Sequence, residues 1–230
     1  MKPARAWVLL PSGRRLNLLE PDPWAWTDRD LAIGVSRTYR WAGYSTWDLP
    51  LSVAQHSLTV LTLTTRTAGS SGLSDAERRR ELLHDATEAL LGGWDPITPL
   101  KPHLGDGFRA LVERLQAALD ERYRLPPWDP GACRRHKEAD HLAAACEAFH
   151  VAGWSREAMR EDLEIDLAPI EHDPLAPEAG FQPWEPWPPN HAAERFLAAL
   201  HEVWPDQPRA TIGPCSFPEG DKPCPRSSMT

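Results

Sequence analysis

The segment ELLHDATE places four ionisable side chains at intervals of three and four residues: Glu81, His84, Asp85 and Glu88. Residues at this spacing share one face of a helix, so these side chains are expected to form one polar stripe. Leucine and alanine cover most of the remaining circumference, which is typical of a buried helix. Buried polar groups must be paired or bind a metal, and imidazole beside carboxylate suits Zn, Co, Mn or Fe. The alternative is a solvated stripe on an amphipathic helix.

Two further polar side chains lie in apolar segments elsewhere in the chain. His56 follows LSVAQ on an otherwise apolar helical pattern, and Asp140 lies in an alanine-rich segment. Taken alone, His56 fits a hydrogen-bonded core histidine, and Asp140 fits a salt bridge or a contact at a helix end. Three buried sites of metal-ligand type on separate helices instead favour one shared metal site.

The elements that must position these residues are mostly helical. Two short apolar runs around Pro11–Arg14 predict a β-hairpin within residues 6–20. Apolar periodicity, with Thr27, Ser52 and Asn190 as candidate N-caps, predicts helices. The predicted helices span 27–42, 52–65, 75–91, 106–123, 132–152 and 191–203, with a further acidic and possible helix at 155–168.

The order of these elements predicts an all-α fold with a small N-terminal β-hairpin. No alternation of strands and helices is visible, which argues against a Rossmann-type fold. Residues 173–190 contain six prolines and are expected to form an extended loop. We expect residues 1–204 to form one domain and the Pro-rich tail 205–230 to be poorly ordered.

Charge and cysteine content exclude several classes of protein. The chain has 230 residues and a net charge of −8, which disfavours a protein that coats a nucleic-acid polymer. No run of apolar residues is long enough for a transmembrane helix. The apolar run near the N-terminus, Trp7–Leu10, is too short for a signal peptide. The four cysteines are interpreted as thiols in a cytoplasmic protein, the alternative being a Cys215–Cys224 disulfide or metal clip.

His56, the pair His84-Asp85 and Asp140 together resemble the H…HD…D signature of the HD-domain metal-dependent phosphohydrolases. Four segments, YRW at 39–41, LSVAQHS at 51–57, LHDATEA at 83–89 and TPLK at 98–101, are similar to the 5′-deoxynucleotidase-like branch. That branch includes bacterial deoxynucleoside monophosphatases and phage dATP triphosphohydrolases. The resemblance covers residues 13–150, with a weaker echo at 186–203, and it implies an HD-domain helical bundle.

The resemblance also implies a role for each matched residue. His56, His84, Asp85 and Asp140 would bind a divalent ion (Zn, Co, Mn or Mg), and Glu88 would be the catalytic carboxylate. The substrate-binding residues would be Arg40, Trp41, Pro99 and Lys101. Relatives are commonly dimers or larger, so a homo-oligomer is expected.

One position departs from the monophosphatase pattern. Those relatives carry an aspartate directly after the glycine that ends the HD helix, whereas this chain has Gly93 there and Asp95 two residues on. Either Asp95 takes this catalytic role or the role is absent.

The predicted function is hydrolysis of a 2′-deoxynucleotide, either a 5′-monophosphate or a triphosphate. A triphosphate requires further cationic side chains at the pocket, for which Arg37, Lys101 and Arg109 are candidates. His103 and His136 lie near matched segments and could touch substrate or metal. The alternatives are a catalytically weak nucleotide- or metal-binding HD module, a purely structural metal site, and an HD-type cyclic-dinucleotide phosphodiesterase. This chain lacks the Gly-Tyr-Pro motif that accompanies the HD signature in the cyclic-dinucleotide phosphodiesterases.

Overall fold

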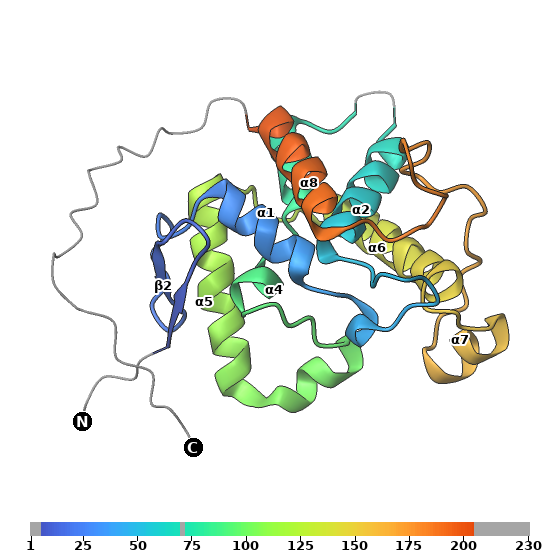
Figure 1. Cartoon of the computed structure of the whole chain (residues 1–230), viewed down its shortest axis with the longest axis horizontal. Coiled ribbons are helices and arrows are strands. Elements are labelled where there is room, and N and C mark those ends of the chain that lie inside the picture. The colour runs from blue at the N-terminus through green and yellow to red at the C-terminus, as the bar shows by residue number, and fades with distance from the viewer. Residues whose placement is uncertain (1–5, 70–71, 205–230) are drawn as a thin grey trace, which may run out of the picture.

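The computed structural model describes residues 6–69 and 72–204, and this part of the chain is mostly helical (Figure 1). It contains eight α-helices, two 3-10 helices and one two-stranded sheet. The all-α prediction with an N-terminal hairpin is therefore confirmed. The predicted tail 205–230, with Cys215 and Cys224, lies outside the described residues. Cys133 and Cys146 are free thiols.

The N-terminal hairpin pairs β1 (Trp7–Leu9) with β2 (Arg15–Asn17) in antiparallel register, with Val8 opposite Leu16. Gly13 in the connecting turn has a φ of 81°, a conformation that glycine adopts without steric cost. Leu16 is fully buried and joins the hydrophobic core, so the hairpin is anchored to the helices through one strand.

Helix α1 (Asp28–Arg37) begins with the predicted cap. Thr27 accepts from the backbone of Asp30, whose side chain accepts from the backbone of Thr27, which is a capping box. The helix ends earlier than the predicted residue 42, because Thr38 is extended and Tyr39 forms an isolated β-bridge with Ser52. The 3-10 helix η1 (Trp41–Gly43) follows. The bridge places residues 40 and 41 beside the start of the next helix.

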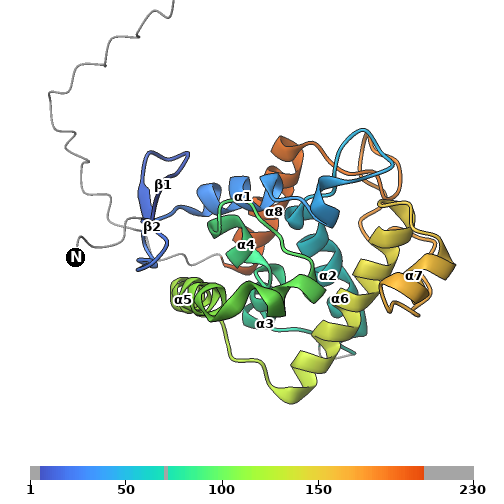
Figure 2. The ribbon, with the colours of Figure 1, turned by 90° about the horizontal axis from the view of Figure 1, so that it is seen from below.

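Helix α2 (Val53–Thr67) is capped by Ser52, as predicted, and is buried along most of its length. It packs against α6 (Pro130–His150), and the two helices run side by side in Figure 2. Helix α2 carries His56, and α6 carries Asp140. Their contact therefore brings together two residues that are 84 positions apart in the sequence.

The predicted continuous helix 75–91 is wrong. The structure has α3 (Asp75–Leu82) and α4 (Ala86–Leu90), separated by non-helical residues 83–85. The backbone carbonyl of Glu81 accepts a hydrogen bond from His84 Nδ1 at 2.8 Å, at the point where the helix ends. The His84 side chain thus donates to a backbone carbonyl that would otherwise accept from a backbone N–H in the next helical turn. The 3-10 helix η2 (Thr98–Leu104) and helix α5 (Gly105–Tyr123) follow.

The C-terminal part contains α7 (Arg156–Asp162) and α8 (Pro189–Val203). The long connection between them is irregular, as the proline content predicts, and Gln55 of α2 binds it through the backbone of Glu185 and Trp187. Asn190 is not the cap of α8, because the helix already begins at Pro189. Helix α8 packs on α1, α2 and α3.

One cluster of buried apolar residues connects the hairpin with α1–α5 and α8. Its largest fully buried members include Trp26, Leu31, Leu82, Leu115 and Phe196. Helices α1 and α8 cover this core side by side, and α5 closes it next to the hairpin (Figure 1). None of the helices in residues 6–69 and 72–204 is long and apolar enough to cross a membrane.

Candidate metal centre

Two imidazole nitrogens and a carboxylate oxygen from three separate segments meet in the interior. His56 on α2 and His84 in the break between α3 and α4 approach through their Nε2 atoms, which are 3.2 Å apart. Asp140 Oδ1 on α6 lies 3.2 Å from His56 Nε2. The ligand atoms of these three residues all lie within 4.8 Å of one another, a spacing that a single metal ion can bridge.

The outer nitrogen of each imidazole is already occupied. His56 Nδ1 lies 2.6 Å from Glu147 Oε1, and His84 Nδ1 lies 2.8 Å from the Glu81 carbonyl. A carbonyl oxygen only accepts, as does an ionised carboxylate, so both Nδ1 atoms must donate. In the neutral rings the Nε2 lone pairs then face each other, which a shared cation satisfies. Metal-bound histidines are held in the same way by their second nitrogen. The donor set therefore fits a divalent metal.

Asp85 is a further carboxylate at this centre. Its Oδ2 atom lies 3.2 Å from His84 Nε2 and 3.4 Å from His56 Nε2. The same oxygen lies 3.5 Å from Arg40 Nη1. Asp85 is thus shared between the two histidines and the guanidinium group, outside the tight group formed by His56, His84 and Asp140.

The site strongly favours positive charge. Burial and the charge of Arg40 disfavour protonation of His56, yet the Glu147, Asp140 and Asp85 carboxylates outweigh them and raise its pKa well above the usual value. Burial would raise the pKa of Asp140, but His56, His84 and Arg40 lower it. The carboxylates favour an extra proton on the neighbouring imidazoles. They would equally stabilise a metal cation in place of that proton.

Arg40 and Trp41 lie beside the centre because of Glu147, a residue that the sequence did not single out. Arg40 Nε donates to Glu147 Oε2 at 2.9 Å, and Trp41 Nε1 donates to the same oxygen at 3.3 Å. Arg40 Nη1 lies 3.5 Å from Asp95 Oδ2. Glu147 follows Asp140 by two helical turns on α6, and this spacing was the only signal in the sequence that could have identified it.

Trp41 and Ala42 have φ values of 56° and 54°, in the left-handed region that non-glycine residues seldom adopt. Such strain persists only where the surrounding structure holds it, and it is concentrated at functional sites. The strained turn directly follows Arg40.

Glu88 is buried on α4, about one helical turn after Asp85. Lys101 Nζ donates to Glu88 Oε1 at 3.2 Å, whereas Glu88 Oε2 is buried with no hydrogen-bond partner among the described residues. Burial, followed by the charges of Asp85 and Asp95, raises the pKa of Glu88 to about 9. Without a bound cation, Glu88 is therefore a neutral acid at pH 7.

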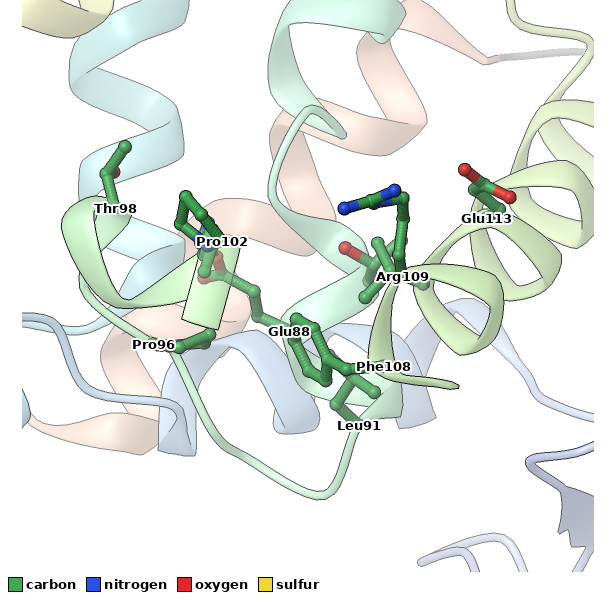
Figure 3. A pocket seen from close by; sticks show the side chains of 11 residues that line it. Glu88, Leu91, Pro96, Thr98, Pro102, Phe108, Arg109 and Glu113 are labelled. Atoms are coloured by element: carbon green, nitrogen blue, oxygen red, sulfur yellow. Dashed lines mark hydrogen bonds and ion pairs between the residues drawn. The ribbon is translucent and has the colours of Figure 1, made fainter. Parts of the chain in front are cut away.

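A cavity of about 430 Å³ opens next to Glu88, between α4, η2 and α5. Figure 3 shows Glu88 between Thr98 and Pro102 on one side and Phe108 and Arg109 of α5 on the other. The ionisable residues of the lining are two of acidic and two of basic type: Glu88, Lys101, Arg109 and Glu113. The rest of the lining is largely apolar, with Leu91, Pro96, Pro102, Phe108 and Val112.

None of the family models searched matches the chain. Over 152 residues, or 66% of its length, the chain is 43% identical to the uncharacterized protein RCAP_rcc00048 of Rhodobacter capsulatus, of which the match covers 76%. The chain belongs to the family of this Rhodobacter protein. The name of that relative states no activity, so membership of its family leaves the chemistry to be inferred from the site.

In this member of the family, most of the residues predicted from the sequence come together. His56, His84, Asp85, Asp140, Arg40 and Asp95 form one connected cluster, with Trp41 joined through Glu147 and Lys101 joined to Glu88. Pro99 is exposed and lies outside the cavity lining. Arg109 and Lys101 line the cavity, whereas Arg37 does not.

The two additional histidines have different surroundings. His136 contacts Glu81 Oε2 at 2.8 Å and stacks on Trp128, and its ring centroid lies 4.8 Å from that of His84. It therefore packs against a predicted ligand without belonging to the three-residue group. His103 is exposed on η2.

Proposed function

We propose that this protein is a metal-dependent phosphohydrolase of the HD-domain type that acts on 2′-deoxynucleotides. The observation that carries the proposal is the opposed pair of His56 and His84 Nε2 atoms beside Asp140, with both Nδ1 atoms already engaged. Asp85 is proposed as the fourth ligand. A divalent ion such as Zn, Co, Mn or Mg would supply Lewis acidity for a phosphoryl oxygen and a lowered pKa for water.

Arg40 is proposed to bind the phosphate. Its guanidinium lies among three carboxylates, and the two Nη1 contacts to Asp85 and Asp95 are both long, at 3.5 Å. A phosphate oxygen at this position would form shorter, charge-assisted hydrogen bonds with the same group. The Nε contact with Glu147 at 2.9 Å would remain and hold the guanidinium in place.

Glu88 is proposed to move the proton. It is neutral at pH 7 in the metal-free protein, and its free Oε2 atom has a hydrogen-bonding capacity that no other described residue uses. A carboxyl group in this state can donate to the leaving oxygen, and in its ionised state it can orient or deprotonate water. Asp95 is associated with Arg40 rather than with Glu88, so we assign it to holding the guanidinium rather than to proton transfer.

The cavity next to Glu88 is proposed to receive the organic part of the substrate. A leaving group that takes its proton from Glu88 must lie on the Glu88 side of the centre, where Phe108 offers an aromatic face. With Glu88 protonated, the lining carries two basic side chains, Lys101 and Arg109, and one ionised carboxylate, Glu113, so a single excess positive charge would face a chain of phosphates. This small excess favours a 5′-monophosphate over a triphosphate.

The competing proposal is a module that binds a nucleotide or metal without hydrolysing it. Glu88 argues against this alternative, because burying a carboxyl group with an unpartnered oxygen costs about 1–3 kcal/mol, a cost that binding alone does not require.

The test is a product assay. Protein loaded separately with Co, Mn, Zn or Mg is incubated with each deoxynucleoside mono- and triphosphate, and the products are resolved by chromatography. Inorganic phosphate released from a monophosphate is the expected result. Triphosphate or pyrophosphate as product would move the substrate to the nucleoside triphosphates. Nucleotide binding without turnover, whichever metal is present, would establish the binding module instead.

A further inference from the structure

The Glu147 side chain contacts three other side chains near the candidate centre. It is 2% exposed and lies on α6, two helical turns after Asp140. Its Oε1 atom lies 2.6 Å from His56 Nδ1, and its Oε2 atom accepts from Arg40 Nε at 2.9 Å and from Trp41 Nε1 at 3.3 Å. One buried carboxylate therefore contacts a candidate metal ligand through one oxygen and two candidate substrate-binding residues through the other.

The contact with His56 determines which nitrogen of that ring carries the proton. An ionised carboxylate holds hydrogen on Nδ1 and leaves the Nε2 lone pair directed towards His84 and Asp140. Both oxygens of Glu147 face donors, His56 Nδ1 on one side and the N–H groups of Arg40 and Trp41 on the other, which is the arrangement that suits an ionised carboxylate.

The contact with Arg40 determines the direction of the guanidinium group. Nε is fixed on Glu147, so the Nη atoms extend towards Asp85 and Asp95, beside the histidines. The Trp41 indole is held by the same oxygen. Arg40 is extended and Trp41 has a left-handed φ, so neither side chain is positioned by a regular α-helix or β-strand. Glu147 supplies this constraint from a rigid helix.

We propose that Glu147 is a positioning residue that orients the metal ligand His56 and the phosphate-binding Arg40 at the same time. The half of this inference that concerns phosphate rests on the proposed phosphohydrolase function, whereas the half that concerns His56 requires only a metal. Neither the sequence motif nor the family relationship assigns Glu147 a role.

Replacement of Glu147 by glutamine gives a sharp test, because the two side chains have the same shape. A carboxamide has one acceptor oxygen and one donor NH₂. If the oxygen remains with Arg40 and Trp41, the NH₂ faces His56 Nδ1, which must then accept, and the proton moves to Nε2. If the amide is reversed, its NH₂ opposes the two donors of Arg40 and Trp41. Glutamine therefore satisfies one half of the contacts and disrupts the other.

The experiment measures Co²⁺ affinity by calorimetry, the His56 tautomer by ¹⁵N NMR in the Zn²⁺-loaded protein, and the KM for a deoxynucleoside monophosphate. For Glu147→Gln we expect either Co²⁺ binding weakened about 10- to 100-fold with a shift of the proton from Nδ1 to Nε2, or a similarly raised KM. Glu147→Asp keeps the charge and should recover part of the lost affinity. Glu138→Gln, on the exposed side of the same helix, is the matched control and should match the wild type.

The inference would be overturned if Glu147→Gln had the same Co²⁺ affinity, the same His56 tautomer and the same KM as the wild type. Should Glu147→Gln fail to fold, the Zn²⁺-loaded wild-type spectrum decides: a downfield-shifted Nδ1 proton on His56 supports the proposal, and a proton on Nε2 of His56 refutes it. Failure of the proposed function has a different signature, which is a wild-type protein that binds Co²⁺ with the Nδ1–H tautomer but hydrolyses no phosphate ester.

Discussion

The Nε2 atoms of His56 and His84 lie 3.2 Å apart, although His56 is on α2 and His84 is in the break between α3 and α4. Two neutral imidazoles whose Nδ1 atoms both donate would present two lone pairs to each other at this distance. The contact is stable only if a proton or a metal ion lies between them. Since the surrounding carboxylates provide the negative charge that a divalent ion needs, this pair is the centre of the functional proposal.

Removal of one ligand should abolish metal binding. For His84→Ala we expect the Co²⁺ affinity to fall by more than about 100-fold, since loss of only a hydrogen-bond partner of a ligand already costs ~10- to 100-fold. Calorimetric titration measures the change, and thermal unfolding verifies the fold. His103→Ala removes an exposed histidine from η2 and should retain wild-type affinity. Full metal occupancy in His84→Ala would show that the ligand set is wrong.

Loss of the buried acid should separate metal binding from turnover. Glu88→Gln should bind Co²⁺ normally and lose about 10²- to 10⁴-fold in kcat, the usual contribution of a general acid or base. Initial rates at saturating substrate and metal give the comparison. Glu113→Gln lies on the α5 wall of the same cavity and should leave kcat close to that of the wild type. Equal kcat values for Glu88→Gln and the wild type would exclude the proposed proton transfer.

The raised pKa of Glu88 also predicts how stability depends on pH. In the unfolded chain this carboxyl group titrates near 4.5, and in the metal-free folded protein its pKa is about 9. Between these values the folded state keeps a proton that the unfolded state has released. The stabilising contribution of protonated Glu88 is therefore complete below pH 4.5 and is lost as the pH rises towards 9. Relative to Glu88→Gln, the wild type should lose up to about 1.4 kcal/mol of unfolding free energy per pH unit.

Urea unfolding of both proteins in a chelator, at several values between pH 5 and pH 8, measures this difference. The other titrating groups contribute equally to the stability of both proteins at each pH. The difference between the two unfolding free energies therefore contains only the contribution of Glu88. Two parallel curves would mean that the pKa of Glu88 is close to its ordinary value.

The cavity predicts an effect on substrate binding. Phe108→Ala should raise KM at least about 5-fold with little change in kcat, because stacking of a base on an aromatic side chain contributes ~1–3 kcal/mol in both ground and transition states. The comparison is Phe149→Ala, which removes a half-exposed ring from α6. A KM for Phe108→Ala equal to that of Phe149→Ala would place the organic group elsewhere.

The position of α4, and hence of Glu88, depends on a close approach to α1. A Cβ atom added at Gly34 would lie 2.8 Å from the Cβ of Ala89. Gly34→Ala should therefore lower the free energy of unfolding by roughly 1–3 kcal/mol, the usual cost of overpacking. Gly107 on α5 has open space around its Cβ position, and Gly107→Ala should be neutral or stabilising by up to ~1 kcal/mol. Unfolding curves in which Gly34→Ala is the more stable variant would contradict this packing.

Features set by local chemistry could be predicted from the sequence. Thr27 and Ser52 cap the helices that follow them, and the turn around Gly13 forms the hairpin, because each depends on residues within a few positions. The break at residues 83–85 was not predicted, because no glycine or proline marks it. It coincides with the hydrogen bond from His84 to the carbonyl of Glu81. Asn190 was assigned as a cap, but the rigid Pro188-Pro189 pair starts the helix earlier.

The same distinction applies to the site. The residue types and their spacing identified His56, His84, Asp85 and Asp140, which the structure brings together. Glu147 could not be identified, because its role depends on partners 91 and 107 positions away in the sequence. The cavity was also beyond prediction, since Phe108 and Arg109 lie on a different helix from Glu88 and meet it only through the packing of α4 and α5.

The decisive measurement is the rate of phosphate release from a deoxynucleoside monophosphate as a function of the Co²⁺ bound per chain. If His56, His84 and Asp140 hold the ion that drives hydrolysis, the rate should be zero in the metal-free protein. It should then rise in proportion to bound Co²⁺ and saturate at one ion per chain. Phosphate release that is the same with and without bound metal, or no release from any nucleotide at full occupancy, would contradict a metal-dependent phosphohydrolase.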